Sequence, residues 1–194
     1  MATTQRTLAR TGGVARLLVP SSLVAFLVAV LALPASALDL SIVAGDVVFT
    51  DLTLDGTNRT TTAVPLAVWE ITDLRLTDEP WTVTLSATAP TTAAGSVETT
   101  ARSIAVSNLV VTTGSFTAGI GSDPATPIVG VSNLVLSTSA QTLVSSPGNT
   151  TGIYVFTPTF SLTMPANAYR SNYAGTIGSS SLNPYVSTLT VTIS

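Results

Sequence analysis

The stretch ITDLRLTDEPWTVTLSA, residues 71–87, decides the fold class of this chain. From Trp81 onward, apolar and hydroxyl residues alternate without a break, so that Trp81, Val83, Leu85 and Ala87 fall on one side. A period of two is typical of a half-buried β-strand. The residues just before Trp81 are mostly polar or charged and predict a turn. The stretch therefore predicts a turn followed by a strand.

The segments around this strand also have strand character, and none keeps a helical period of 3.6 residues over ten positions. Turn signals such as Asp55-Gly56 separate them, because glycine tolerates the positive φ of a tight turn. The expected strands are 47–54, 62–72, 81–88, 104–111, 131–136, 151–164 and 188–194. We predict an all-β protein, an antiparallel, Ig-like β-sandwich of about 7–9 strands.

Two prolines and one repeat refine this prediction. Pro65 has no N–H donor, which predicts an edge strand or a bulge in 62–72, and Pro158 predicts a bend or bulge that divides 151–164 into two strands. The pentapeptide VSNLV occurs at 106–110 and at 131–135. This repeat is too short for a solenoid and predicts two similar strands in one sandwich, joined by a long connection over 114–126.

The N-terminal segment has the pattern of a secretory signal peptide. Arg6, Arg10 and Arg16 precede the apolar run 17–33, and Ala35-Ser36-Ala37 offers small residues for cleavage. We predict a signal peptide over 1–37 and a single domain over 38–194, with an uncleaved N-terminal anchor as the alternative. The protein is then secreted or extracellular, at a cell surface.

The composition excludes several classes of function. After residue 37 there are four arginines and ten carboxylates, a net charge of −6, so neither nucleic acid nor an anionic membrane surface is an expected partner. The chain has no cysteine, lysine or histidine, which excludes disulfides and histidine-based catalysis or metal binding. The final LTVTIS carries no wall-sorting signal or hydrophobic tail, so we expect any retention at a surface to be non-covalent.

Several motifs together resemble the WxL domain, a cell-surface module of Gram-positive bacteria. Trp81-Thr82-Val83 stands where that family has its first Trp-x-Leu motif, with valine in place of leucine, and no second motif follows, since Thr190-Val191-Thr192 occupies that region. The other matching segments are LTLDGT (52–57), ITDLR (71–75), LTMPANAYRSNY (162–173) and YVSTLTVTIS (185–194). The resemblance covers most of the chain after residue 37 and implies non-covalent binding to cell-wall peptidoglycan.

The candidate wall-binding residues follow from this resemblance. Trp81 and Val83 would form the contact with a glycan, the Trp81 ring stacking on a sugar, while Asp73 and Arg75 order the preceding turn. The strand alternation favours another interpretation, in which Trp81 is a core residue between two sheets. Trp69 alternates with Ala67 and Ile71 and is also predicted to lie in the core.

The carboxylates of the same turn raise the question of a metal. Asp73, Asp78 and Glu79 are weak Ca²⁺ candidates, because Ca²⁺ binds six to eight oxygens, but their spacing matches no defined calcium loop. The alternative is a solvated acidic turn in which Asp73 pairs with Arg75. We expect no cofactor and no enzymatic activity. The main hypothesis is a surface protein that binds wall glycan or a partner surface protein, and the alternative is a structural subunit of a fibre or layer that assembles through sheet edges.

Overall fold

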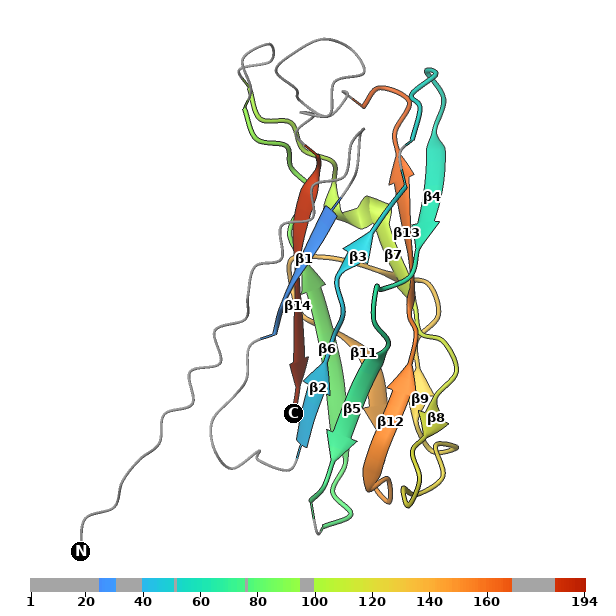
Figure 1. The fold of residues 1–194 in the computed structure, drawn as a ribbon. Coiled ribbons are helices and arrows are strands. Elements are labelled where there is room, and N and C mark those ends of the chain that lie inside the picture. Colours follow the sequence, from blue (N-terminus) through green and yellow to red (C-terminus); the bar gives the residue numbers. More distant parts are fainter. Residues whose placement is uncertain (1–24, 31–39, 51, 76, 95–99, 169–183) are drawn as a thin grey trace, which may run out of the picture.

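The computed structural model describes residues 25–30, 40–50, 52–75, 77–94, 100–168 and 184–194, and over these ranges the protein is all-β (Figure 1). Its helical structure there is a single 3-10 turn, η1 (Val106–Asn108). The strands are β1 (Ala25–Val30), β2 (Leu40–Val43), β3 (Val47–Val48), β4 (Arg59–Ala63), β5 (Trp69–Asp73), β6 (Trp81–Ala87), β7 (Leu109–Thr112), β8 (Thr117–Ala118), β9 (Val129–Gly130), β10 (Leu134–Val135), β11 (Gln141–Ser146), β12 (Gly152–Phe156), β13 (Thr159–Met164) and β14 (Val186–Ile193). The predicted antiparallel β-sandwich is confirmed.

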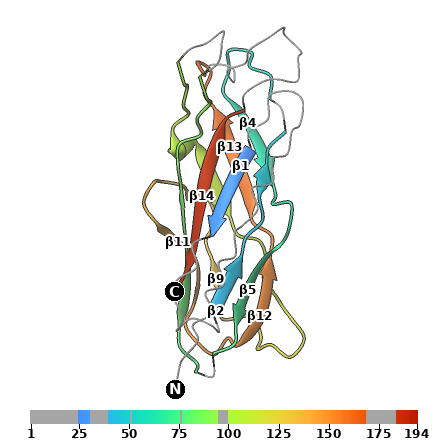
Figure 2. The ribbon, with the colours of Figure 1, turned by 60° about the vertical axis from the view of Figure 1, so that its left-hand side comes forward.

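The strands form three sheets that enclose one core. Sheet A has the order β3-β1-β14-β6-β11-β9, sheet B the order β2-β5-β12-β8, and sheet C the order β10-β7-β13-β4. All pairs are antiparallel except β1 with β14, which is parallel. Figures 1 and 2 show an elongated sandwich with sheet C in its upper half and sheet B in its lower half. Buried residues of all three sheets form one hydrophobic cluster.

Sheets B and C are two halves of one layer, because three stretches of chain each give one strand to each sheet. The pairs are β4 and β5, β7 and β8, and β13 and β12. Pro65, Gly114 and Pro158 lie between the members of these pairs. Both prolines lack a ladder donor, and a Cβ at Gly114 would lie 2.6 Å from the carbonyl oxygen of Thr157. The break predicted at Pro158 is confirmed, and at Pro65 the expected strand 62–72 divides in two, with β4 at an edge of sheet C.

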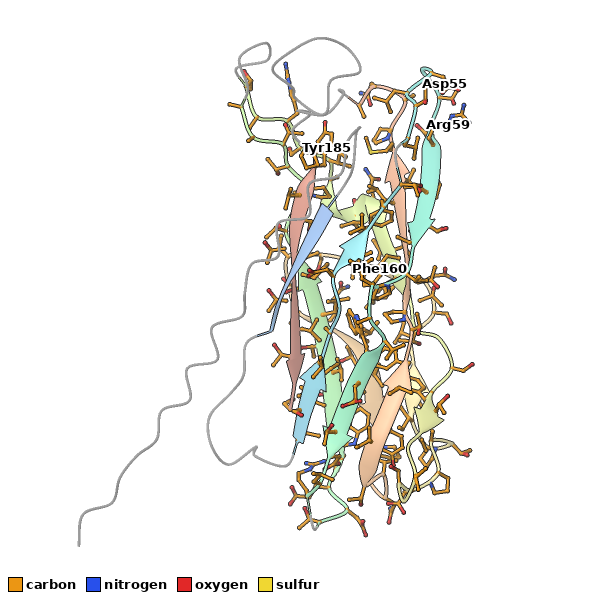
Figure 3. All side chains as sticks on the ribbon, viewed as in Figure 1. Asp55, Arg59, Phe160 and Tyr185 are labelled. Carbon is orange, nitrogen blue, oxygen red and sulfur yellow. The ribbon has the colours of Figure 1, made fainter. Side chains whose placement is uncertain are left out.

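An aromatic cluster fills the core near these breaks. The ring centroid of Trp69 lies 5.7 Å from that of Phe156 and 6.0 Å from that of Phe160, and Phe116 lies 4.9 Å from Phe156 (Figure 3 labels Phe160). Such edge-on and tilted pairs add to the burial of their large apolar surfaces. The predicted core position of Trp69 is confirmed, since the residue is fully buried.

Strand β6 is the centre of sheet A and matches the sequence pattern. Its alternate residues Trp81, Val83, Leu85 and Ala87 are buried, and the residues between them are partly exposed. It pairs with β14 on one side and with β11 on the other. β11 was not expected, because its ladder shifts at Leu143, so that Leu143 and Val144 are both buried and the alternation is lost.

The repeated pentapeptide pairs with itself. The two copies contribute β7 and β10, which are antiparallel with Leu134 opposite Val111 and Val135 opposite Val110. A strand therefore forms in each predicted segment, but both are shorter than expected: 104–111 is a strand only from Leu109, and 131–136 only over Leu134–Val135. The copies also differ locally. The first copy begins with the 3-10 turn η1, whereas Asn133 of the second has φ 55°.

Other expectations require correction. The expected strand 47–54 is reduced to the two residues of β3. The connection 114–126 is not a simple loop, because it contains β8, which extends sheet B beside β12. Part of the predicted signal peptide forms β1, whereas residues 1–24 and 31–39 lie outside the described ranges, so the cleavage after Ala37 stays a prediction. Over the described residues, no helix is both long and apolar enough to span a bilayer.

Candidate functional site

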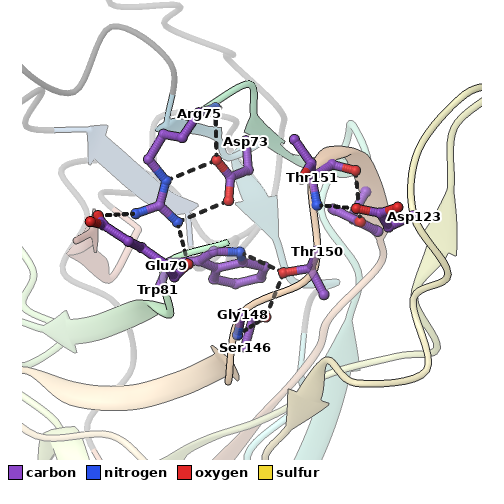
Figure 4. Close-up of polar contacts among 10 residues, drawn as sticks. Asp73, Arg75, Glu79, Trp81, Asp123, Ser146, Gly148, Thr150 and Thr151 are labelled. Carbon is purple, nitrogen blue, oxygen red and sulfur yellow. Dashed lines mark hydrogen bonds and ion pairs between the residues drawn. The ribbon is translucent and has the colours of Figure 1, made fainter. Parts of the chain in front are cut away.

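The turn between β5 and β6, which carries the candidate residues, lies at the lower end of the sandwich in Figure 1. β5 ends at Asp73 and β6 begins at Trp81. The loop between β11 and β12, residues 147–151, packs beside this turn (Figure 4). The site is therefore built from two connections that the sandwich brings to one end.

Asp73 and Arg75 form a bidentate ion pair. The Nε and Nη2 atoms of Arg75 donate to Oδ1 and Oδ2 of Asp73, each at 2.9 Å, and the Arg75 backbone N–H donates to Oδ1 at 3.1 Å. Nη2 also donates to the carbonyl oxygen of Glu79 at 2.9 Å, which ties the far side of the turn to the pair. Hydrogen bonding to Asp73 raises the pKa of Arg75. This geometry holds the turn closed.

Trp81 is a core residue whose indole takes part in a buried polar contact. Its Nε1 donates to Oγ1 of Thr150 at 3.0 Å, and the hydroxyls of Thr150 and Ser146 lie 2.5 Å apart. Ser146 Oγ in turn accepts from the Gly148 N–H at 3.2 Å. Trp81, Ser146 and Thr150 are all buried, so each polar atom needs the partner it has.

Gly148 brings the second loop close to the turn. Its φ is +109°, and a Cβ there would lie 2.3 Å from the carbonyl oxygen of Asp78. A third segment is joined on the other side, because Asp123 accepts the Thr151 N–H at 2.9 Å and donates its own N–H to the Thr151 carbonyl at 2.9 Å. The Tyr154 hydroxyl donates to the same carbonyl, and burial raises the pKa of this tyrosine.

The structure thus brings Asp73, Arg75 and Trp81 together, but in structural contacts. Trp81 is 1% exposed and Val83 is fully buried, so neither offers a face to a sugar in this conformation. The predicted pairing of Asp73 with Arg75 is confirmed, whereas the expectation that the turn is solvated is wrong for Asp73, which is 3% exposed. Sequence reasoning missed Ser146 and Thr150, whose only signal was the turn composition around Gly148, and Asp123, which lies in the turn-rich segment 119–124.

The carboxylates of the turn are not gathered around one point. Both oxygens of Asp73 accept from Arg75, and Asp78 and Glu79 are exposed. Within the described ranges, no three His, Cys, Asp or Glu side chains are placed to hold a metal ion.

A second carboxylate–guanidinium pair lies at the opposite, upper end (Figure 3). Asp55 accepts from Arg59 and also from the hydroxyl and N–H of Thr57, at 2.7 and 3.1 Å. The hydrogen bond from Arg59 is the main cause that lowers the pKa of Asp55 to about 2. Gly56 beside it has φ +83°, which confirms the predicted turn.

A group of exposed aliphatic side chains lies away from both ends, on two neighbouring segments. Residues 43–47 run beside residues 64–68: Val47 bridges Pro65, and the Leu66 N–H donates to the Asp46 carbonyl at 2.8 Å. Four side chains on these segments are 52–67% exposed, and we name them the apolar strip: Val43, Val64, Leu66 and Val68.

Comparisons of the chain with protein-family models, with curated proteins and with solved structures found no match. The resemblance to the WxL domain therefore rests on the sequence motifs alone, and the all-β sandwich rests on the strand pairing described above.

Proposed function

We propose that this protein is a secreted, non-enzymatic surface protein that binds a partner protein non-covalently, with the apolar strip as its contact surface. The observation that carries the proposal is the strip itself. Exposed aliphatic residues that stand singly are ordinary, whereas a group on adjacent segments is typical of a site that another surface covers. The resemblance to the WxL domain supports the location at a bacterial cell surface.

The backbone beneath the strip is held in place, which favours binding. The Leu66–Asp46 hydrogen bond and the bridge between Val47 and Pro65 join the two segments. Gly45 packs so closely that a Cβ there would lie 2.7 Å from the Ala67 carbonyl oxygen. A surface that is ordered before binding loses less conformational entropy when the partner arrives.

The chemistry of the strip favours a protein over a wall glycan. A sugar ring stacks best on a flat aromatic face, flanked by polar groups that bind its hydroxyls. In the described residues the exposed large apolar side chains are all aliphatic, while Trp69, Trp81 and Tyr154 are buried. Binding to wall glycan therefore remains the alternative to binding a partner protein, and the experiment below distinguishes the two.

The use of the carboxylates supports a non-enzymatic role. Asp73 is held by Arg75, Asp55 by Arg59 and Thr57, and Asp123 by the Thr151 backbone. A glycosidase uses two carboxylates that face each other across a cleft about 5–10 Å wide. Asp55 instead lies at the upper end of the sandwich (Figure 3), and Asp73 ends β5 at the lower end (Figure 1).

The test uses a photo-crosslinking residue in place of Leu66 in the full chain, displayed on Gram-positive cells. Thr62 on β4, which is exposed but polar, is the matched control position. We expect a covalent protein adduct from position 66, identified by mass spectrometry, and none from position 62. A Leu66→Asp variant with unchanged thermal unfolding should lose cell-surface retention.

Two results would contradict the proposal. Equal adducts from both positions would mean that the strip is not a specific contact. Sedimentation of the protein with purified, protein-free peptidoglycan, unaffected by Leu66→Asp, would favour the glycan alternative.

A second candidate, a structural subunit of a fibre or layer, is favoured by one observation. β4 is a five-residue strand at the edge of sheet C. Its exposed residues Thr60 and Thr62 are uncharged, and its one charged residue, Arg59, stands at the first position and is paired with Asp55. Size-exclusion chromatography and electron microscopy over a concentration series check this candidate, which predicts assemblies that Thr62→Pro abolishes.

A further inference from the structure

We propose that sheet A contains a strand-binding slot between β14 and β3, and that residues 25–30 of the same chain occupy this slot in the full-length protein. The ligand class is an extended apolar peptide of about six residues that lies parallel to β14. This inference concerns a different surface from the apolar strip and does not depend on the proposed partner.

The pairing of β1 defines the slot. All six residues of β1 have a Cα partner in β14, from Ala25 opposite Val186 to Val30 opposite Val191. The first two also pair with β3, antiparallel, with Phe26 opposite Val47. β1 therefore lies between two strands (Figure 1), and it makes the one parallel pair among the described strands.

The backbone of β14 has a free set of groups for such a peptide. Val186, Thr188 and Ser194 use their backbone groups toward β6 and its extensions, in bonds to Thr91, Thr88 and Thr82. Because the N–H and C=O groups of successive strand residues point to opposite sides, those of Ser187, Leu189, Val191 and Ile193 point to the edge that β1 occupies. Without β1, these groups would form an open sheet edge.

The residues beside the slot are apolar. Leu189 and Val191 of β14, Val47 of β3 and the adjacent Phe49 are all fully buried when β1 is in place. We expect removal of β1 to bring water to this part of the core, which is unfavourable for apolar surface. Both the open edge and this apolar surface favour occupation by an extended apolar strand.

The predicted signal-peptide cleavage would change what occupies the slot. Cleavage after Ala37 would separate β1 from the rest of the chain, because β1 lies wholly before that bond. Residues 25–30 would then belong both to the signal peptide and to sheet A. After cleavage, the slot between β14 and β3 would still bind an extended apolar peptide.

The first experiment tests the register in the full chain, which has no native cysteine. Ala29→Cys with Thr190→Cys places the two cysteines on Cα partners, about 5 Å apart, within disulfide range. Ala29→Cys with Thr192→Cys is the control, since two further residues along the strand bring the separation to about 8 Å. Under mild oxidation we expect several-fold more intramolecular disulfide in the first variant, measured by mass spectrometry.

The second experiment tests retention of the strand. A protease site placed within residues 31–37 allows the folded full chain to be cut. We expect the N-terminal fragment to stay bound through size-exclusion chromatography. Ala29 pairs with Thr190, between Leu189 and Val191 whose backbone groups face β1, so the Ala29 N–H faces β14 and Ala29→Pro should release the fragment several-fold faster than Val28→Pro.

Both experiments can overturn the proposal. Equal crosslinking in the two cysteine variants, or crosslinking only between molecules, contradicts occupation by the chain's own residues 25–30. Release of the fragment with no change in the unfolding free energy of the remainder contradicts the slot, and so does unfolding of the remainder upon release. A remainder that stays folded with a lowered unfolding free energy supports it.

Discussion

The two ends of the sandwich use the same pair of residues for different purposes. At the upper end, the side chains of Asp55 and Arg59 are 39% and 50% exposed, and their partners lie within one turn. At the lower end, those of Asp73 and Arg75 are 4% and 17% exposed and are joined to Glu79, close to Trp81. Burial, rather than the ion pair itself, makes the lower turn a structural element.

We expect the largest difference in stability between the two ends when Gly148 and Gly56 are each replaced by alanine. Gly148→Ala should destabilise the protein by about 3 kcal/mol, because a positive φ is combined with a Cβ contact of 2.3 Å to the Asp78 carbonyl oxygen. Gly56→Ala should cost only about 1 kcal/mol, because Gly56 also has a positive φ but no atom lies within 4 Å of its Cβ position. Urea unfolding of both variants measures this, and equal losses would mean that the lower loop adjusts freely.

We expect the second-largest difference in stability when Arg75 and Arg59 are each replaced by methionine. Arg75→Met leaves the buried carboxylate of Asp73 without its partner and should cost about 2–3 kcal/mol of unfolding free energy. The same change at Arg59 should leave stability unchanged within error, since that pair is exposed. Chemical denaturation of the two variants side by side is the measurement, and a similar loss at both positions would remove the distinction between the ends.

The buried hydroxyl should matter less than the ion pair. Thr150→Val keeps the shape of the side chain but removes the acceptor of the Trp81 indole and the partner of Ser146, a loss of about 1–2 kcal/mol. Thr151→Val is the control, because Thr151 takes part in the described contacts through its backbone. Thermal unfolding followed by tryptophan fluorescence compares them, and an unchanged Thr150→Val would show that the indole contact adds no stability.

The smallest effect concerns acid. The pKa of Asp55 falls from 3.8 to about 2 on folding, so its contribution to stability is complete above pH 3.8 and is lost as the pH falls toward 2. Because the group is exposed, we expect Asp55→Asn to flatten the stability profile only slightly in that window, and salt to reduce the difference further. Unfolding measured from pH 2 to 5 checks the sign, and a larger effect above pH 4 would contradict it.

The parts of the fold that could be predicted from the sequence are those governed by a single local feature, such as a period-two alternation or a proline without an N–H donor. β6 has a strict alternation, and Pro158 removes a ladder donor, so the strand and the break were both found. β11 was missed because a bulge at Leu143 places two neighbouring residues in the core. β8 and β9 have two residues each, too few to show any period.

The candidate site was predicted only in its local contacts. Asp73 and Arg75 are two residues apart, and their pairing followed from their charges. The contact between Trp81 and Thr150 joins residues 69 positions apart, and it depends on how two connections meet at one end of the sandwich. No local sequence pattern indicates that these two connections lie side by side. The burial of Trp81 beside the loop 147–151 is therefore seen only in the structure.

The breaks at Pro65, Gly114 and Pro158 have a mechanical consequence. They interrupt three neighbouring stretches in the layer of sheets B and C, whereas β6 and β14 of sheet A cross the same region without interruption. A sideways force on one end of this long, narrow protein would therefore be resisted mainly by sheet A, and the opposite layer would yield at its line of breaks. Sheet A is therefore the stiffer layer, and the layer of sheets B and C is expected to bend at its breaks.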